Sequence, residues 1–543
     1  MLSGGSTRAV EVRTCIPAKR LLVPFLFLIV ALISRWRFLG DPIITGVDEQ
    51  FYALIANRML QGKTLYVEVW DRKPIGLFLI YAAGSLFGNI LLGSQMLALL
   101  AVTGTATILY RLARRVADTV SSVLAGLIYI VFLTLAGGEG GQSPVFYNLP
   151  VAGAVALFMW TRRQDASTSG NLRTGGAWTM LLIGLALQIK YTAVFEGLFL
   201  GLMLVYTAWS RHRTFRALTL DAAIWIGCAL APTFAVALAY AAMGNFDDWL
   251  FANFISISLR SSEPARIVTL RLVGLLVLLS PLLGAWLLRL AIVRRPAEPS
   301  QCADQLFLDA WATAALSAVA FFGTWYGHYA LPLFAPLAVA AAPLGQRKFG
   351  RVCLLLLFAC AGLAGQVLGI VHAEQRGDAK LLTSATAAIA GQRTCLFIYD
   401  GPTSLYDASG SCLYSSRPFP ENLRLLNEYR AVGVDQAAEI RRIMAKRPDY
   451  VMLREPAAPE DNPVTGTIMQ DALRRAYVVW WRYPVQGRDY VIYSRRNLHP
   501  TKLTADAGSQ DQAKSCRAAV APPWSDPVRA IAWHLAPIMG ACI

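Results

Sequence analysis

The chain has 543 residues, of which 55% are hydrophobic and only 15% are charged, and its mean hydropathy is +0.46. A soluble protein of this length needs far more charge to cover its surface, so the composition excludes a wholly soluble chain. The formal net charge of +16 would by itself suggest a nucleic-acid partner. Most Lys and Arg residues, however, lie in short clusters between apolar runs, which is the placement that orients membrane proteins. We therefore expect a lipid bilayer, and no nucleic acid, as partner.

The basic clusters and the apolar runs between them predict about eleven transmembrane helices. After the basic segment 1–20, which we expect to be cytoplasmic, each interval between clusters leaves room for two spans of ~20 residues. Arg35 and Arg37, rather than a cleavage site, follow the first apolar run, so we expect a retained span and not a signal peptide. The predicted spans are 21–38, 90–111, 118–136, 146–161, 176–190, 193–210, 221–242, 269–292, 308–324, 328–343 and 349–372.

An odd number of spans places the two ends of the chain on opposite sides of the membrane. The connections 137–145 and 324–327 carry no Lys or Arg, as expected of outer loops. The first external loop, 39–89, falls on the same outer side, as does everything after residue 372. We find no internal repeat, so an inverted-repeat transporter is not supported.

The first external loop holds the densest mixture of acids and bases in the chain. Residues 48–61 have helical spacing, with two acids in the first turn, where the helix dipole favours negative charge. Residues 75–87 form a second apolar segment that is too short for a span. We predict two amphipathic helices at the outer membrane surface, which hold the acids and a basic cluster between them. The alternative is a solvated surface loop.

A change in composition near residue 373 predicts a small external α/β domain, 373–500. Residues 395–400, 449–453, 477–481 and 489–494 have the pattern of short strands, and 437–447 that of an amphipathic helix. Cys395 and Cys412 lie at strand edges and would pair in an oxidising compartment; two buried free thiols are the alternative. The remaining segment, 501–543, is a tail without an assigned structure.

Several motifs in the outer loops resemble those of one enzyme superfamily. They are D-E-x-x-Y (48–52), G-x-x-x-Y (62–66), Lys73-Pro74 and Phe87-Gly88, with later matches at 184–196 and 327–342. Together they resemble the GT-C membrane glycosyltransferases, near the bacterial protein O-mannosyltransferases and lipid A aminoarabinose transferases (glycosyltransferase 39-like). Three features depart from the pattern, the first being that GGEGGQSPVFYN (137–148) offers only Glu139 and Asn148 where many relatives carry an Asn-Thr-Glu-like motif. Ile75 replaces a second proline, and Arg72 stands where the aminoarabinose transferases have an acid.

This resemblance implies transfer of a sugar, with inversion, from a polyprenyl-phosphate-linked donor. The acceptor would be lipid A or lipopolysaccharide, a cell-surface polysaccharide, a lipid or a protein outside the bacterial plasma (inner) membrane. A carboxylate must take the acceptor's proton, and cations must stabilise the departing phosphate. The implied catalytic residues are Asp48 and Glu49, and the implied phosphate-binding residues are Arg72, Lys73 and Lys190. Further pocket candidates are Tyr52, Tyr66, Asp71, His328 and Tyr329.

Each assignment has a plainer alternative. Glu49 would simply stabilise the start of its helix, and Arg72 and Lys73 would sit at headgroup level. Lys190 would lie at the water-exposed tip of a tight helical hairpin, and His328 would be structural. A divalent metal ion is left open as cofactor, with Asp48, Asp71 and His328 as candidate ligands.

Two other functions fit a polytopic protein with charged loops: a transporter or flippase of lipid-linked sugars, and a polymerase or ligase of surface polysaccharide. A transferase should gather Asp48, Lys73, Lys190 and His328 around one outward-facing cavity. A transporter should instead place its charges along a path through the membrane midplane.

Overall fold

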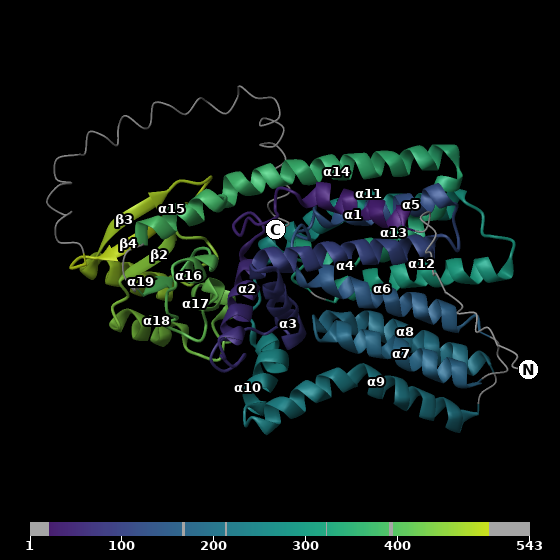
Figure 1. The fold of residues 1–543 in the computed structure, drawn as a ribbon, viewed down its shortest axis with the longest axis horizontal. Coiled ribbons are helices and arrows are strands. Elements are labelled where there is room, and N and C mark those ends of the chain that lie inside the picture. Colours follow the sequence, from purple (N-terminus) through teal and green to yellow (C-terminus); the bar gives the residue numbers. More distant parts are fainter. Residues whose placement is uncertain (1–20, 165–168, 212–213, 322, 390–394, 499–543) are drawn as a thin grey trace, which may run out of the picture.

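The computed structural model describes residues 21–164, 169–211, 214–321, 323–389 and 395–498. Long helices run side by side, and a smaller domain with a β-sheet lies at one end of them (Figure 1). The basic segment 1–20 and the tail 501–543 of the sequence analysis fall outside the described residues.

Every predicted span coincides with a helical segment. Most boundaries agree within a few residues because they follow the ends of the apolar runs. The helices are α1 (Leu22–Arg35), α4 (Ile90–Ala113), α5 (Thr119–Leu133), α6 (Ser143–Thr161), α7 (Ser169–Leu187), α8 (Val194–Ser210), α9 (Phe215–Ala242), α11 (Ala265–Ile292), α12 (Pro299–Ala320), α13 (Phe334–Ala341) and α14 (Lys348–Arg376).

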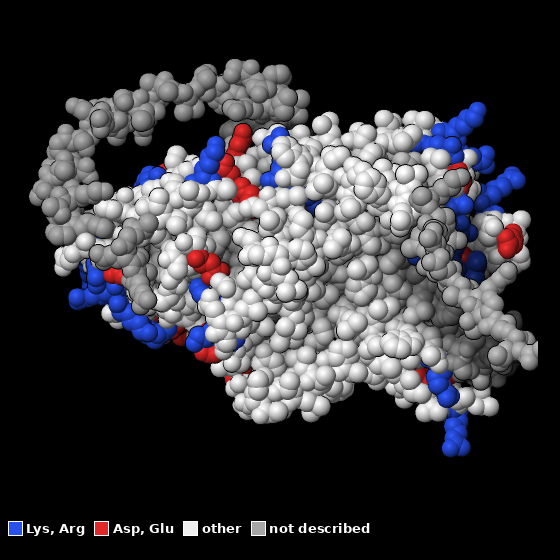
Figure 2. Space-filling view, in the orientation of Figure 1, with Lys and Arg blue, Asp and Glu red and all other residues white. Residues whose placement is uncertain are grey.

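Six helical segments in the described part of the chain are long and apolar enough to cross a membrane: α4, α6, Tyr191–Ser210, α9, α11 and Lys348–Ile389. Four shorter apolar helices accompany them: Leu22–Arg35, Ile75–Phe87, Thr119–Leu133 and Phe334–Gln346. The chain is therefore a multi-pass membrane protein, but length and composition do not establish eleven crossings. Figure 2 shows a broad uncharged belt over the helices, with Lys and Arg gathered on either side of it, at the end opposite the small domain and on the small domain itself.

The two helices expected in the first external loop are α2 (Val47–Leu60) and α3 (Ile75–Gly84), which a short 3-10 turn extends to Phe87. The sequence predicts that α2 buries a single apolar face, but in the structure it is buried on more than one face. Phe51, Leu54, Ile55 and Ala56 are all at most 1% exposed. The small domain covers the second face, and its Phe419 ring stacks on Phe51 with ring centroids 4.5 Å apart.

One segment near the cavity had no assigned structure in the sequence analysis. It comprises α10 (Phe246–Leu250), a π-helical turn (Phe251–Ile255) and a 3-10 turn (Ser256–Leu259), between α9 and α11. Asn253 and Ser256 on these turns are buried and hydrogen-bonded to Tyr66 and Arg72 of the loop 39–89. The segment thus forms part of the wall between the helices and the small domain.

The small domain contains a four-stranded sheet of order β1-β2-β4-β3. Its strands are β1 (Leu396–Ile398), β2 (Tyr450–Glu455), β3 (Tyr477–Tyr483) and β4 (Asp489–Arg495); β1 pairs parallel with β2, and the other pairs are antiparallel. All four predicted strands are present, and α18 (Gln436–Ala445) matches the predicted amphipathic helix.

Alternating side chains of the strands pack on opposite faces of this sheet. Phe397 and Val451 belong to one cluster with residues of α18 and α19 (Pro463–Ala476). Leu396 and Met452 belong to the main core, together with residues of α15 (Ala379–Ile389). A disulfide joins Cys395 to Cys412, whose Cα atoms are 5.5 Å apart.

Candidate active site

A cavity of about 890 Å³ opens where the helix ends meet the small domain. This volume is within the usual range for pockets that bind small molecules. Its charged and polar lining comes from the ends of helices and the loops that follow them. The main contributors are Asp48, Asp71, Arg72, Lys73, Gln142, Lys190, Arg260, Glu263, Tyr326, His328, Tyr329, Arg376, Glu421, Glu428 and Arg454.

Asp48 lies in the first turn of α2 and is half-buried. Its Oδ2 accepts a hydrogen bond of 2.7 Å from Nε2 of Gln142, and no described residue hydrogen-bonds its other oxygen. Burial alone would raise the pKa of Asp48, but the positive charge of Lys73 and the hydrogen bond from Gln142 outweigh it and hold this pKa below its ordinary value. Asp48 therefore offers one fixed and one free carboxylate oxygen, in the ionised form at neutral pH.

Two contacts position Lys73: a hydrogen bond to its backbone carbonyl and an aromatic ring beside its ammonium group. The Tyr66 hydroxyl donates to the Lys73 carbonyl at 2.9 Å, and Pro74 then precedes the first turn of α3 in an extended conformation. The ammonium lies 4.7 Å from the Tyr52 ring centroid and 3.9 Å from Oδ2 of Asp71. Its charge is thus presented beside Asp48 without a close ion pair.

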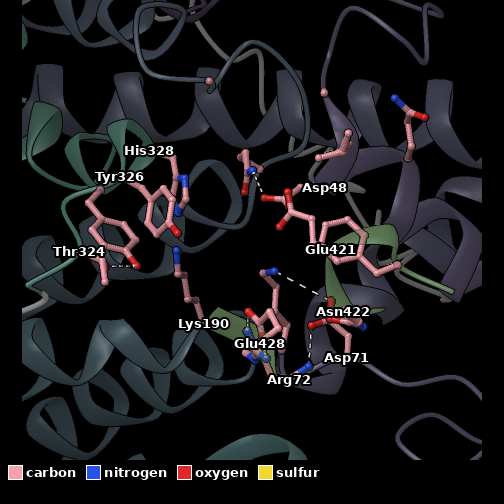
Figure 3. A pocket seen from close by; sticks show the side chains of 18 of the residues that line it. Asp48, Asp71, Arg72, Lys190, Thr324, Tyr326, His328, Glu421, Asn422 and Glu428 are labelled. Carbon is pink, nitrogen blue, oxygen red and sulfur yellow. Dashed lines mark hydrogen bonds and ion pairs between the residues drawn. The ribbon is translucent and has the colours of Figure 1, made fainter. Parts of the chain in front are cut away.

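Lys190 reaches the opposite wall from the turn between α7 and α8. Its ammonium lies 5.3 Å from the centroid of the Tyr329 ring. The His328 ring is stacked on Tyr326 and meets Tyr329 edge-on, with centroids 5.7 Å and 4.8 Å apart. Figure 3 shows Lys190 and His328 pointing toward each other on this side, across the cavity from Asp48.

Arg72 has a different environment from the two lysines. Its guanidinium nitrogens donate to the two carboxylate oxygens of Glu428 at 2.8 and 2.5 Å, and Arg260 joins the same carboxylate at 2.9 Å. Burial raises the pKa of Glu428, but the hydrogen bonds and charge of Arg72, followed by the charge of Arg260, outweigh it and lower this pKa. This cluster, Arg72–Glu428–Arg260, clamps the loop 39–89 to the small domain and neutralises much of the charge of Arg72.

Three sequence candidates do not line the cavity: Glu49, Tyr52 and Tyr66, each at most 1% exposed. Tyr52 packs its ring on Phe78 and Tyr81. Glu49 faces the glycine-rich connection 137–141, where a Cβ added to Gly140 would lie 2.0 Å from its Oε2. Burial raises the pKa of Glu49 well above its ordinary value, with Glu139 and Asp48 adding to the effect. Glu49 thus supports the loop that carries Gln142.

The candidate metal ligands do not form a metal site by geometry. Within the described ranges, no group of three or more His, Cys, Asp or Glu side chains could hold a metal ion. Asp48 is instead held by an amide, and His328 lies among aromatic rings. We therefore assign no chemical step to a metal ion.

Several cavity residues were not singled out by the sequence. Gln142 belongs to the connection 137–145, in which the sequence analysis notes the lack of Lys and Arg but does not single out Gln142. Glu421, Glu428 and Arg454 come from the small domain, hundreds of residues away from Asp48, so no local pattern connects them with it.

This architecture has counterparts among solved structures. No family model matches the chain, and no curated protein matches its sequence. The crystal structure of ArnT from Cupriavidus metallidurans bound to undecaprenyl phosphate matches with a TM-score of 0.57 and 15% identity, covering 88% of this chain and 98% of that one. The apo structure of the same enzyme matches with a TM-score of 0.56 and 16% identity, over the same shares of the two chains.

The chain has the fold of ArnT. At such low identity the likeness concerns the fold alone, but it extends over nearly the whole ArnT chain. It confirms the expected fold class at the level of architecture: a polytopic helical membrane protein that shares the fold of ArnT and carries a small C-terminal sheet domain.

Proposed function

We propose that this protein is a membrane glycosyltransferase that moves a sugar, with inversion, from a polyprenyl-phosphate-linked donor to an acceptor on the extracytoplasmic side of a bacterial inner membrane. The observation that carries the proposal is that Asp48, Lys73, Lys190 and His328, distant in sequence, line one cavity. The ArnT structure with undecaprenyl phosphate supports the choice of donor, because the two chains share a fold.

The free oxygen of Asp48 is the proposed base. It takes the proton of the acceptor hydroxyl as the hydroxyl oxygen attacks the anomeric carbon of the donor sugar. Gln142 keeps the carboxylate in place through its other oxygen. Because Asp48 is already ionised at neutral pH, it needs no prior loss of a proton.

The leaving phosphate requires positive charge at the moment the bond to the sugar breaks. We assign this role to Lys73 and Lys190, whose ammonium groups have no carboxylate within hydrogen-bonding distance among the described residues. Arg72, whose guanidinium is engaged by Glu428, is assigned to the wall of the site rather than to the phosphate. His328 and Tyr329 border Lys190 and would contact the donor on that side.

Placement of the charged groups argues against a transporter or flippase. Asp48, Lys73 and Lys190 all lie at helix ends or in the connections between helices, next to the small domain. A transport path would need polar groups at successive depths along the spans. A ligase or polymerase would instead join polysaccharide chains, and the donor and acceptor identified in the experiment below separate it from a transferase of single sugars.

The test is transfer by the purified protein in nanodiscs. Undecaprenyl-phosphate-linked hexoses and pentoses with a radiolabelled sugar are supplied as donors, and envelopes of a strain lacking this gene as acceptors. We expect label to move from the lipid to an envelope component, which mass spectrometry then identifies as glycolipid, polysaccharide or protein. Movement of intact donor between leaflets, without transfer, would support the flippase instead.

A further inference from the structure

The small domain places one of its carboxylates, Glu421, beside Asp48 in the cavity. Glu421 lies in the first turn of α17 (Pro420–Arg424), and Figure 3 shows its side chain on the same side of the cavity as Asp48. The stacked rings of Phe51 and Phe419 fix this arrangement. Phe51 is about one helical turn after Asp48, and Phe419 is two residues before Glu421, so the stack brings the two acids together.

The charged groups around Glu421 come from several elements. They are Asp48 of α2, Arg424 of its own helix, Glu428 and Arg260. Both arginines are engaged elsewhere: Arg424 pairs with Asp461 and Asp400, and Arg260 with Glu428. In the described part of the chain, the Glu421 side chain has neither a hydrogen bond nor an ion pair. Its carboxyl group is therefore available to interact with a molecule bound in the cavity.

The two acids differ in their readiness to hold a proton. Burial, and then the negative charge of Asp48, raises the pKa of Glu421 to about 7. The pKa of Asp48 is held below its ordinary value. Facing carboxyls whose environments separate their pKa values are a common arrangement for passing a proton.

We propose that Glu421 is a second acid–base residue of the transfer reaction, which receives from Asp48 the proton of the acceptor hydroxyl and releases it to water. This inference rests on the proposed function. The acceptor O–H bond breaks and its proton goes to Asp48. The new bond to the anomeric carbon forms as the sugar–phosphate bond breaks, with the electron pair leaving on the phosphate. Asp48 then returns to its ionised form by passing the proton, through a water molecule of the cavity, to the Glu421 carboxylate.

The first test is the pH dependence of transfer by Glu421→Gln, with Glu421→Asp and Glu460→Gln beside it. Glu460 is an exposed acid of the small domain that does not line the cavity, so it serves as matched control. The wild-type rate should rise through pH 7, as the Glu421 carboxylate forms. Glu421→Gln should lower kcat by about 10-fold, less than loss of the primary base, and should abolish this rise. Glu421→Asp should restore part of it, and Glu460→Gln should behave as wild type.

A second test needs no substrate. Infrared spectra of the purified protein between pH 5 and 9 should show a protonated carboxyl group that titrates near pH 7 and is absent from Glu421→Gln. Asp48→Asn should shift this titration to lower pH, because it removes a neighbouring negative charge.

A pH profile that is unchanged in Glu421→Gln would overturn the inference, even if the KM for the acceptor rose. If the wild type transfers sugar and Asp48→Asn does not, that result would leave the proposed function standing. Failure of the wild type to transfer any donor sugar would overturn both.

Discussion

The two lysines at the cavity end of the helical bundle differ from the arginines at its other end in how closely they are paired. At the end opposite the small domain, Asp304 is fully buried and pairs with Arg162, Arg163 and Arg115. At the cavity end, Lys73 lies 3.9 Å from its nearest paired carboxylate, and Lys190 forms no ion pair within the described part of the chain. An acid shared by several arginines holds helices together, whereas cations left without close partners around a cavity are available to a ligand. The comparison distinguishes charged residues that stabilise the fold from charged residues that can bind a substrate.

Asp48→Asn should have the largest effect on transfer. The substitution keeps the size of the side chain and its contact with Gln142 but removes its ability to accept a proton. We expect the rate to fall by ~10²-fold or more, with normal membrane insertion. Asp247→Asn, an exposed acid of α10, is the control and should not change the rate. Near-normal turnover of purified Asp48→Asn would remove Asp48 as the base.

Lys73→Ala should weaken binding of undecaprenyl phosphate by about 1.5–3 kcal/mol, the usual scale for hydrogen bonds to charged groups. Lys73→Arg should recover only part of this loss, because a planar fork does not reproduce a compact ammonium. Binding is measured in nanodiscs of constant lipid composition. Lys63→Ala is the matched control, since Lys63 lies in the same loop but is exposed and paired with Glu68. Equal losses in both variants would point to general attraction of the lipid rather than to a site.

Asp304→Asn tests the opposite end and should affect stability rather than chemistry. It leaves three arginines close together without their shared acid. We expect a loss of roughly 2 kcal/mol in the free energy of unfolding, less than for a fully buried pair because the arginines are partly exposed. Unfolding in detergent is compared with that of Glu298→Gln, an exposed acid on α12's N-terminal side. A selective loss of donor affinity in Asp304→Asn would contradict the division of roles between the two ends.

The smallest effect should come from the clamp Arg72–Glu428–Arg260. Because the folded-state pKa of Glu428 is lowered, its contribution to stability is present above its unfolded pKa, about 4.3. That contribution is lost only as the pH falls through the lower, folded-state value. The difference in melting temperature between wild type and Glu428→Gln should therefore stay constant from pH 8 to pH 6 and shrink below about pH 4. A difference that changes near pH 7 would show that another group controls the clamp.

The elements that the sequence predicts well are those whose signal is local. Apolar runs with basic ends predict the long helices, and short runs of apolar, β-branched and aromatic residues predict all four strands. The same signal underestimates how much of α2 is buried. Gln50 is polar and would be expected at the surface, but it is buried in the structure, where it accepts a hydrogen bond from Ser404 of the small domain. No secondary structure is predicted for the segment 246–259, because its acids and Asn253 fit the pattern of neither a membrane span nor a strand.

The site residues are predicted from sequence motifs. A motif identifies individual residues but not the residues from other parts of the chain that contact them. Lys73 and Lys190 were named from such motifs and line the cavity. Arg72 was named with them, but its carboxylate partner lies 356 residues further along the chain. Gln142 and Glu421 have no motif of their own and become visible only when the loop and the small domain pack around Asp48. Residues that act through tertiary contacts cannot be found from one sequence alone.

The hydrogen bond from Tyr66 to the Lys73 carbonyl has a consequence for the backbone. Tyr66 has φ = 72°, in the left-handed region that favours glycine, and a residue with a side chain is strained there by about 1–2 kcal/mol. A glycine would relieve this strain but would lose both the hydroxyl and a ring that is almost completely buried. The backbone at Tyr66 is therefore strained. The hydrogen bond that this conformation allows fixes the peptide group that directs Lys73 into the cavity before any donor binds.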